Sequence, residues 1–143
     1  LILGSFPSVR SRAEGFYYGH PRNRFWPVLA AVFSEPLPES IPEKRALLAR
    51  HGLALWDVLR SCEITASADA SIRAAVPNDI PALTQRFGIT RILANGRTAE
   101  TLYRRAGFPM PIRALPSTSP ANASRSLPAL VEVWGRALRG DPE

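Results

Sequence analysis

The chain alternates short apolar runs with longer amphipathic stretches from one end to the other. The apolar runs are too short for surface helices and predict buried strands. The predicted strands cover residues 1–3, 53–58, 89–94 and 112–115. Between them, apolar residues recur at the three- and four-residue spacing of one helix face. The predicted helices cover residues 22–33, 40–50, 79–87, 98–106 and 127–138.

Local signals support several of these boundaries. Ser40 and Glu43 have the spacing of a capping box at the start of the second helix. Asn78 or Asp79 is expected to cap the third helix, because both residue types favour that position. After the second strand we expect a polar loop that continues through Ser71.

Strands separated by helices favour a mostly parallel sheet with helices on both faces. The expected fold class is α/β, a three-layer α/β/α sandwich with a central, mostly parallel four-stranded sheet. In such a sheet the active crevice lies at the carboxyl ends of the strands. The segments expected there are rich in Ser, Thr, Asn, Pro and Arg, which suits a surface that binds a phosphate backbone. They are residues 4–23, 57–67, 95–98 and 116–124.

With 143 residues, the chain is expected to form a single domain over residues 1–143. It begins inside an apolar segment, which predicts that a few N-terminal residues precede it. Basic residues exceed acidic ones by 18 to 12, and all of them except Lys44 are arginine. This mild positive field favours a polyanionic partner. The coding bias of a genome also raises arginine content, so the charge does not by itself establish nucleic-acid binding.

Cysteine content and hydropathy limit the cellular compartment and the kinds of partner that we expect. Cys62 is the only cysteine, which excludes a disulfide framework and a cysteine-ligated iron–sulfur cluster or zinc finger. No apolar run approaches the ~20 residues of a membrane span, and no basic-then-apolar leader is present in this sequence. We therefore expect a cytoplasmic protein with no membrane partner.

Functional side chains are densest in residues 15–26, GFYYGHPRNRFW. Ring faces suit stacking on a planar group, amide and imidazole groups suit reading its edge, and guanidiniums suit phosphates. Together these groups match a flipped nucleobase in nucleic acid. The alternative is a core-packing loop with solvated arginines, because aromatic side chains are usually buried.

Taken in order, these segments resemble the uracil-DNA glycosylase superfamily, and most closely its hypoxanthine-DNA (deoxyinosine) glycosylase branch. The matching segments are GSFPS, GFYYGHPRNRFW, LALWDVL, ILANGRTA and LPSTSPANA. The resemblance implies a monofunctional DNA glycosylase that hydrolyses the N-glycosidic bond of a deaminated base in base excision repair. It also implies a monomer that uses no metal or cofactor and whose partner is DNA containing a deaminated base.

Many superfamily members carry an Asp or Asn two positions after the Gly of the first turn, where it orients or activates the attacking water. Phe6 occupies that position here, and a phenyl ring can do neither. The resemblance to the hypoxanthine branch assigns the catalytic role to Asn23 of the HPRN segment instead. The alternative is that Asn23 only bonds free amides at the start of a helix.

The same resemblance suggests how the base is held. Tyr18 matches the position whose ring stacks on the extruded base in mismatch-specific uracil-DNA glycosylases, unless it is a core tyrosine. His20 would donate to a base carbonyl or a phosphate, or serve a structural role. Asp57 would read the N1–H edge of hypoxanthine and is the second catalytic candidate, unless it only caps a loop. The expected base-contacting residues are Ser5, Phe6, Tyr18, His20 and Asn95.

The segment from Ser117 to Ala121 aligns with the His-Pro-Ser-Pro-Leu type motif that grips the DNA backbone and inserts a wedge into the minor groove. Ser117 replaces the histidine that stabilises a leaving uracil anion, and Ala121 replaces the large apolar wedge. Both departures favour release of a poorly paired purine over release of uracil. The expected DNA contacts are Ser8, Arg10, Ser117, Thr118, Ser119, Ala121 and Asn122.

Two other functions remain open. A mismatch-specific uracil/thymine-DNA glycosylase would differ in base preference, and a non-catalytic damaged-DNA-binding module would bind without releasing a base. A doubly wound nucleotide-binding enzyme lacks support, because the first loop has neither GxGxxG nor a Walker lysine. No lysine lies in the crevice segments, so a Schiff-base lyase is not expected.

Overall fold

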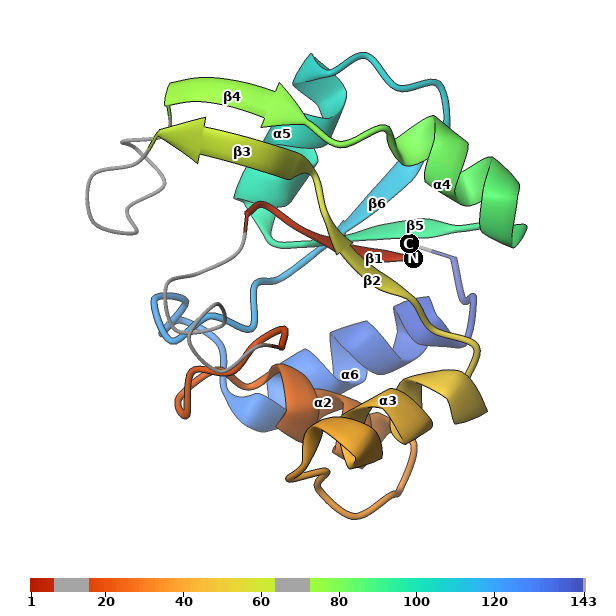
Figure 1. Cartoon of the computed structure of the whole chain (residues 1–143). Coiled ribbons are helices and arrows are strands. Elements are labelled where there is room, and N and C mark those ends of the chain that lie inside the picture. Colours follow the sequence, from red (N-terminus) through yellow and green to blue (C-terminus); the bar gives the residue numbers. More distant parts are fainter. Residues whose placement is uncertain (7–15, 64–72, 143) are drawn as a thin grey trace.

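The computed structural model describes residues 1–6, 16–63 and 73–142. Within these ranges, four short strands form the central sheet in the order β2-β1-β5-β6 (Figure 1). They are β1 (Ile2–Gly4), β2 (Leu55–Asp57), β5 (Ile92–Asn95) and β6 (Ile112–Leu115). Each pairing in this sheet is parallel. The structure thus confirms the predicted four-stranded sheet.

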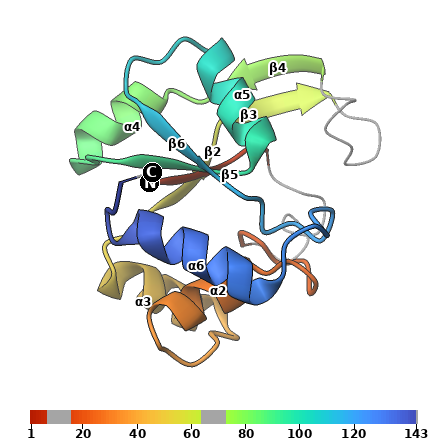
Figure 2. The ribbon, with the colours of Figure 1, turned by 180° about the vertical axis from the view of Figure 1, so that it is seen from behind.

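Helices cover both faces of the sheet (Figures 1 and 2). One layer consists of α2 (Phe25–Val32), α3 (Ile41–Arg50) and α6 (Leu127–Leu138), and the other of α4 (Ile80–Phe87) and α5 (Arg97–Arg105). The strands serve both layers because successive side chains point to opposite faces. Ile2 belongs to the apolar core with α2, α3 and α6, whereas Leu3 belongs to the core with α4 and α5. The predicted three-layer sandwich is confirmed.

Side-chain caps begin two helices as the sequence predicts. The Ser40 hydroxyl accepts the Glu43 backbone N–H at 3.2 Å, and the Glu43 carboxylate accepts the Ser40 N–H at 3.3 Å. The Asp79 carboxylate accepts the Ala82 N–H at 3.1 Å at the start of α4. Each cap supplies an acceptor to an N–H group that has no partner within its own helix.

Helix α2 begins at Phe25, three residues later than residue 22, where the sequence predicts its start. A turn precedes it, closed by the Asn23 N–H donating to the His20 carbonyl at 2.9 Å. The Asn23 side chain then accepts the Phe25 N–H at 2.9 Å. Asn23 is therefore outside the helix, where its side chain bonds the first helical amide.

The polar loop predicted after the second strand is wrong for residues 59–63. These residues form β3 (Leu59–Glu63), which pairs antiparallel with β4 (Arg73–Pro77) in a second, two-stranded sheet beside α5 (Figure 1). The pairing is irregular, with shifts in register along both strands. Such a strand depends on a distant partner instead of on local alternation, so its polar residues carried no strand signal.

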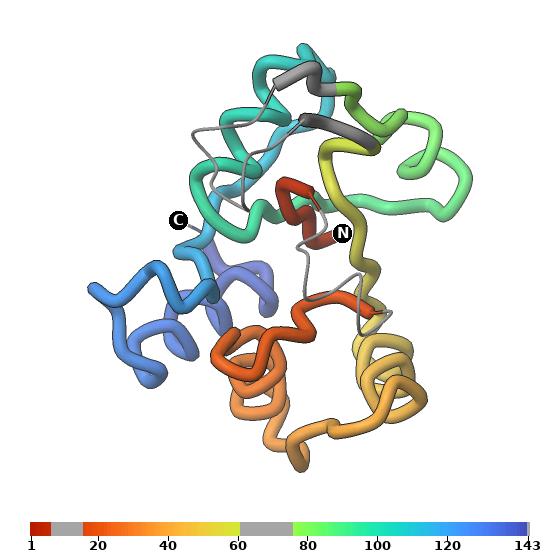
Figure 3. The backbone as a smooth tube through the Cα atoms, turned by 60° about the vertical axis from the view of Figure 1, so that its left-hand side comes forward, coloured from red at the N-terminus to blue at the C-terminus, as the bar shows by residue number. Residues whose placement is uncertain are grey.

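The carboxyl ends of the four parallel strands meet at one end of the sheet, which Figure 3 brings forward. From β1 the chain leads through α2 and α3 on one face, and from β2 it returns through α4 on the other face to β5. Ligands of open α/β sheets bind where connections diverge in this way. Residues 16–24 and 116–126 lie side by side at this end (Figures 1 and 3). None of the helices in the described ranges has the length and apolarity to cross a bilayer.

Candidate active site

Asp57 is a buried carboxylate at the carboxyl end of β2, and its side chain is held against Gly4 of β1. The register of β1 and β2 pairs these two residues, and Asp57 is only 7% exposed. A Cβ atom on Gly4 would lie 2.6 Å from the Asp57 Oδ1 and 3.4 Å from the Tyr18 hydroxyl. Real contacts are not as short as the first of these, so only glycine leaves room for both oxygens beside β1.

Tyr18 lies between Gly4 of β1 and Phe25 of α2. Its ring stacks on Phe25, with centroids 4.1 Å apart and planes inclined by 22°. Its backbone has a φ of 56°, an uncommon conformation for a residue other than glycine. Burial raises the pKa of the Tyr18 hydroxyl well above its usual range, a hydrogen bond with Asn95 opposes this, and the Asp57 charge adds to it. Tyr18 therefore stays a neutral hydroxyl beside a carboxylate.

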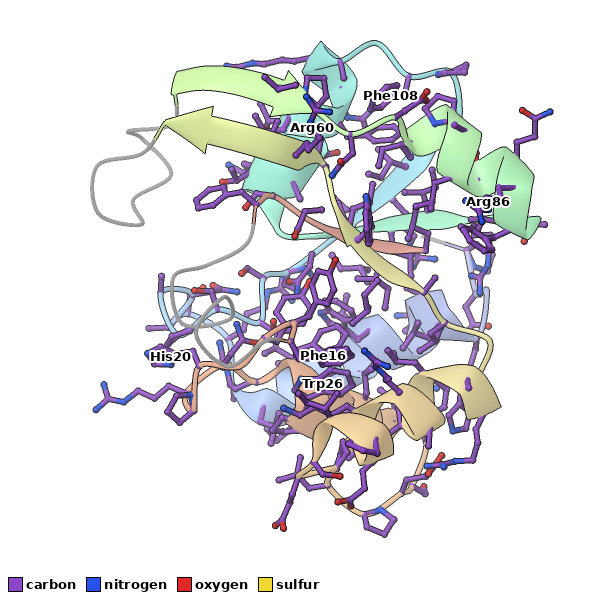
Figure 4. The ribbon with its side chains drawn as sticks, in the orientation of Figure 1. Phe16, His20, Trp26, Arg60, Arg86 and Phe108 are labelled. Carbon is purple, nitrogen blue, oxygen red and sulfur yellow. The ribbon has the colours of Figure 1, made fainter. Side chains whose placement is uncertain are left out.

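Tyr17 extends this wall. Burial, together with the Asp57 charge, raises the pKa of Tyr17 to about 12. The Tyr17 backbone carbonyl accepts the Trp26 indole N–H at 3.1 Å, and the Phe16 ring stacks on Trp26 with centroids 6.0 Å apart. Figure 4 shows Phe16 and Trp26 together above α3. The aromatic stretch is thus anchored on α2, with its tyrosine hydroxyls toward Asp57.

Thr118 joins the other side of the crevice through a single buried side chain. Its hydroxyl donates to the Asn23 Oδ1 at 2.9 Å and accepts from the Asn95 Nδ2 at 3.0 Å. Its backbone N–H donates to the Asn95 Oδ1 at 3.0 Å, and its carbonyl accepts the Arg24 N–H at 3.0 Å. Thr118 is completely buried. It therefore fixes the end of β5 and the start of α2 relative to the loop after β6.

That loop, residues 117–125, is organised by its own short side chains. The Asn122 Nδ2 donates to the Ser117 carbonyl at 2.9 Å, and the Ser117 hydroxyl accepts the Ser119 N–H at 3.1 Å. The Ser119 hydroxyl in turn accepts the Ala121 N–H at 3.2 Å. These bonds hold the loop in a compact form that presents Ala121 at the surface.

Arg24 ties the same loop to α2. Its guanidinium donates to the carbonyls of Ser119 at 3.4 Å and Asn122 at 2.7 Å, and also to the carbonyl of Arg125. One planar cation with several donors thus satisfies three backbone carbonyls of residues 117–125. The sequence suggested that the arginines flanking the aromatic stretch suit phosphates, but this one is turned toward protein carbonyls.

A family model described as the uracil DNA glycosylase superfamily matches residues 1–137, which span the described strands and helices up to the last turn of α6. The chain belongs to the uracil DNA glycosylase superfamily. The predicted family is therefore confirmed, and the crevice at the carboxyl ends of the strands is the candidate active site of a superfamily member.

Two curated relatives are similar over most of this chain. A protein named hypoxanthine DNA glycosylase from Methanosarcina acetivorans is 35% identical, over 85% of this chain and 79% of its own. Another of the same name from Methanosarcina barkeri is 33% identical, over 97% of this chain and 89% of its own. A solution NMR structure of a Methanosarcina acetivorans protein, provisionally named a uracil DNA glycosylase, superposes with a TM-score of 0.79 at 33% identity. The superposition covers 97% of this chain and 88% of the Methanosarcina acetivorans chain, which confirms the fold.

The structure of this superfamily member brings together most of the predicted site residues. Asn23, Tyr18, Asp57 and Asn95 are linked through Thr118, Gly4 and the hydrogen bonds described above. Thr118 is one of the predicted DNA contacts, but its enclosed hydroxyl has no surface to offer a DNA backbone in this conformation. The predicted DNA contacts Ser8 and Arg10 lie outside the described residues.

Three of the predicted base-contacting residues lie at the edge of the candidate site. Phe6 packs against the core formed with α4 and α5, and Ser5 uses its carbonyl to accept the Leu59 N–H at 3.0 Å. His20 is exposed and points away from the sheet in Figure 4. Its Nδ1 accepts the Arg22 N–H at 3.0 Å, so a neutral ring carries its proton on Nε2. This leaves an outward N–H donor at the edge of the site.

Gly4, Tyr17 and Arg24 belong to the site but are not among the predicted site residues. Gly4 is found only through its close approach to Asp57, and Arg24 only through carbonyl partners about a hundred positions away in the chain. A shallow hollow of about 310 Å³ at the amino end of β6, lined by Phe108 and Met110 among others, contains none of the predicted residues. The available signal for Tyr17 was its place between two other aromatics.

Proposed function

We propose that this protein is a monofunctional DNA glycosylase that hydrolyses the N-glycosidic bond of deoxyinosine and releases hypoxanthine. The two curated relatives, both named hypoxanthine DNA glycosylase, support this activity. The proposed enzyme works as a monomer on DNA containing a deaminated base, as part of base excision repair. The cytoplasmic location and the single domain over residues 1–143 stay predictions from the sequence.

The observation that carries the proposal is the buried Asp57 carboxylate beside Gly4, with the Tyr18 hydroxyl close to the same glycine and Tyr17 near enough for the Asp57 charge to raise its pKa. An ionised carboxylate can only accept hydrogen bonds. Hypoxanthine presents an N1–H donor, whereas adenine presents a lone pair at the same position. Asp57 therefore favours hypoxanthine over the normal purine from which it is formed.

Tyr18 is the proposed stacking platform for the extruded base. Because Phe25 already covers one face of its ring, the base would use the other face. Such stacking stabilises an unstacked base by roughly 1–3 kcal/mol. The base edge would then face Asn95, and Ser5 and Phe6 line the turn after β1. His20, exposed at the margin, would donate to a phosphate from its outward N–H.

The chemistry needs no covalent intermediate. Breaking the bond produces an oxocarbenium-like sugar, which nearby DNA phosphates would stabilise, and a negatively charged base, which aimed donors would stabilise. Water would then bond to the sugar carbon, and the proton that it loses would balance the proton taken up by the departing base. Asn23 and Asp57 are the proposed catalytic residues. Ser117, Ser119, Ala121 and Asn122 would contact the DNA backbone from the loop after β6.

The decisive measurement is abasic-site formation on duplexes that carry inosine, uracil, xanthine or a G:T mismatch. We expect the fastest release from inosine. Faster release of uracil or mismatched thymine would instead indicate a mismatch-specific glycosylase. Binding to inosine-containing DNA without release of any base would indicate a damage-binding module and would overturn the proposal.

A further inference from the structure

We propose that Asn23 acts on the substrate as a hydrogen-bond donor through its Nδ2 group, and that Thr118 is the positioning residue that holds it in this orientation. The inference rests on the proposed glycosylase function and assigns the chemical role of one residue in it. It changes the role suggested by the sequence, in which Asn23 orients or activates the attacking water.

The orientation of the Asn23 amide follows from partners that can only donate. The Phe25 backbone N–H lies 2.9 Å from one terminal atom of the side chain, and a backbone N–H cannot accept. That atom must therefore be the oxygen, whatever the ambiguity between amide oxygen and nitrogen in general. The terminal nitrogen occupies the other position.

The same oxygen also accepts the Thr118 hydroxyl at 2.9 Å. The Thr118 hydroxyl must be the donor in this bond, because the Asn23 oxygen can only accept. The hydroxyl oxygen accepts from the Asn95 Nδ2, so its single proton is available for Asn23. Asn95 is itself oriented by the Thr118 N–H, which donates to its Oδ1 at 3.0 Å. Every donor and acceptor in this network has one consistent assignment.

An amide oxygen has two lone pairs. In Asn23 both are used, by Phe25 and Thr118, so the oxygen has no capacity left to accept a proton from water. A water bound to Asn23 could only accept from Nδ2, which draws electron density from the water oxygen and does not help to remove a proton from it. Asn23 is therefore unsuited to activate the nucleophile.

The Nδ2 group is accessible instead. It makes no hydrogen bond within the described residues, and no buried side-chain nitrogen or oxygen in those ranges lacks a partner. Nδ2 must consequently be in contact with solvent, at the crevice end of the sheet. Its two N–H donors suit an acceptor atom of the extruded nucleotide, where negative charge grows as the base departs.

The test compares Asn23→Asp with Asn23→Ala in single-turnover excision of hypoxanthine at saturating enzyme. An aspartate keeps both acceptor bonds to Phe25 and Thr118 but replaces the donor by a carboxylate. We expect Asn23→Asp to be at least as slow as Asn23→Ala, about 100-fold below the parent, the size of losing one aimed donor. Its thermal midpoint should stay near that of the parent, because Asp caps helix amides as well as Asn does.

The pH profile gives a second readout that a purely structural role would not move. Protonation returns a donor to the introduced carboxyl group, so the rate of Asn23→Asp relative to the parent should rise as the pH falls. If Asn23 activated water, the carboxylate would be the better base, and the relative rate would rise with pH. The other titratable and charged groups around the crevice are present in both proteins and cancel in this ratio: Asp57, Tyr17, Tyr18, His20 and Arg24.

Three further variants complete the test. Arg86→Gln makes the same one-unit change in net charge at an exposed residue of α4, away from the site, and should keep the parental single-turnover rate and profile. Thr118→Val removes the hydroxyl that holds the Asn23 oxygen and should slow excision, whereas Thr118→Ser should restore it. A parent that releases no base refutes the proposed function. An active parent with an Asn23→Asp variant that matches or exceeds it refutes the donor role alone.

Discussion

Gly4 is the residue whose lack of a side chain makes the site possible. The Asp57 Oδ1 would lie 2.6 Å from a Cβ atom at this position, and the Tyr18 hydroxyl 3.4 Å from it. The carboxylate and the tyrosine can converge on β1 only because a hydrogen atom stands there. Conformational freedom is not the reason, since Gly4 is an ordinary strand residue.

Gly4→Ala should therefore displace Asp57 and reduce excision more than it reduces stability. Overpacking of this kind costs about 1–3 kcal/mol of unfolding free energy. Single-turnover excision and urea unfolding measure the two effects. Gly135→Ala in α6 is a suitable control, because the nearest atom to a Cβ there, at 3.0 Å, belongs to the flexible end of a side chain, the Arg139 guanidinium. Equal activity of Gly4→Ala and the parent would show that Asp57 does not need its observed place.

The crevice tyrosines should make stability depend on alkaline pH. Burial and Asp57 raise the pKa of Tyr17 to about 12, and burial raises that of Tyr18 as well. A raised pKa in the folded state means that folding favours the neutral hydroxyl. The resulting stabilisation is complete below the unfolded pKa of about 10 and is lost as the pH rises through the folded pKa.

Unfolding by urea across this range, together with tyrosinate absorbance, checks the expectation. The contribution of these groups to the free energy of unfolding should not change with pH near neutrality and should fall above about pH 10. Tyr17→Phe and Tyr18→Phe should each reduce that fall. Ionisation of all three tyrosines at the ordinary pKa would contradict it.

At the scale of elements, the start of α2 and the loop after β6 behave as one unit. Arg24 donates to three carbonyls of residues 117–125, and Thr118 bonds Asn23 and Asn95. α2 and α6, which flank these loops, also pack on each other. The rings of Phe25 and Trp134 meet edge to face, with their centroids 5.9 Å apart. The two loops are therefore positioned by a shared helical layer.

Removing the Arg24 guanidinium should loosen the loop after β6. We expect Arg24→Gln to lower the free energy of unfolding by about 2 kcal/mol, the size of losing hydrogen bonds from a charged donor. It should also weaken binding to inosine-containing DNA. Arg24→Lys should recover little of the lost stability, because a single ammonium group cannot make the several hydrogen bonds of the planar guanidinium.

Urea unfolding and equilibrium binding to a duplex measure these effects. Arg22→Gln, at an exposed arginine two positions away, is the matched control for loss of one positive charge and should leave stability unchanged. If the two glutamine variants lose binding equally while stability is unaffected, Arg24 contributes only its charge.

At the scale of the whole molecule, the layered fold separates the one lysine from the crevice. Lys44 lies on α3, with its ammonium 5.4 Å from the centre of the Trp26 ring. α3 belongs to the outer part of one helical layer (Figure 1), whereas the site lies at the carboxyl ends of the strands. Because Lys44 is the only lysine of the sequence, the side chains described at the site offer no lysine amine for a Schiff base with the sugar.

Reduction with borohydride during turnover should therefore trap no covalent enzyme–DNA complex. The product should be an intact abasic site, and the strand should break only after alkali treatment. Lys44→Ala should keep the parental rate of base release. A trapped complex that disappears in Lys44→Ala would show lyase chemistry and contradict the hydrolytic mechanism.

Local signals in the sequence were sufficient for much of the architecture. The bounds of β6 and α6 agree with prediction, because apolar runs and helical spacing are properties of neighbouring residues. The capping box at Ser40 is equally local. Parallel strand order also placed the polar loops at one end of the sheet, so Asp57, Asn95 and Thr118 could be expected near each other.

Tertiary structure decided the rest, since the contacts concerned join residues far apart in the chain. β3 forms only by pairing with β4 beyond residue 72, and its polar sequence carries no strand pattern. Asn23 and Thr118 are 95 positions apart, yet their hydrogen bond fixes which atom of the Asn23 amide reaches the crevice. The sequence by itself determined which polar groups this protein carries to the site. Only packing of the layers decided which lone pairs and protons remain available there, because each is set by a distant partner.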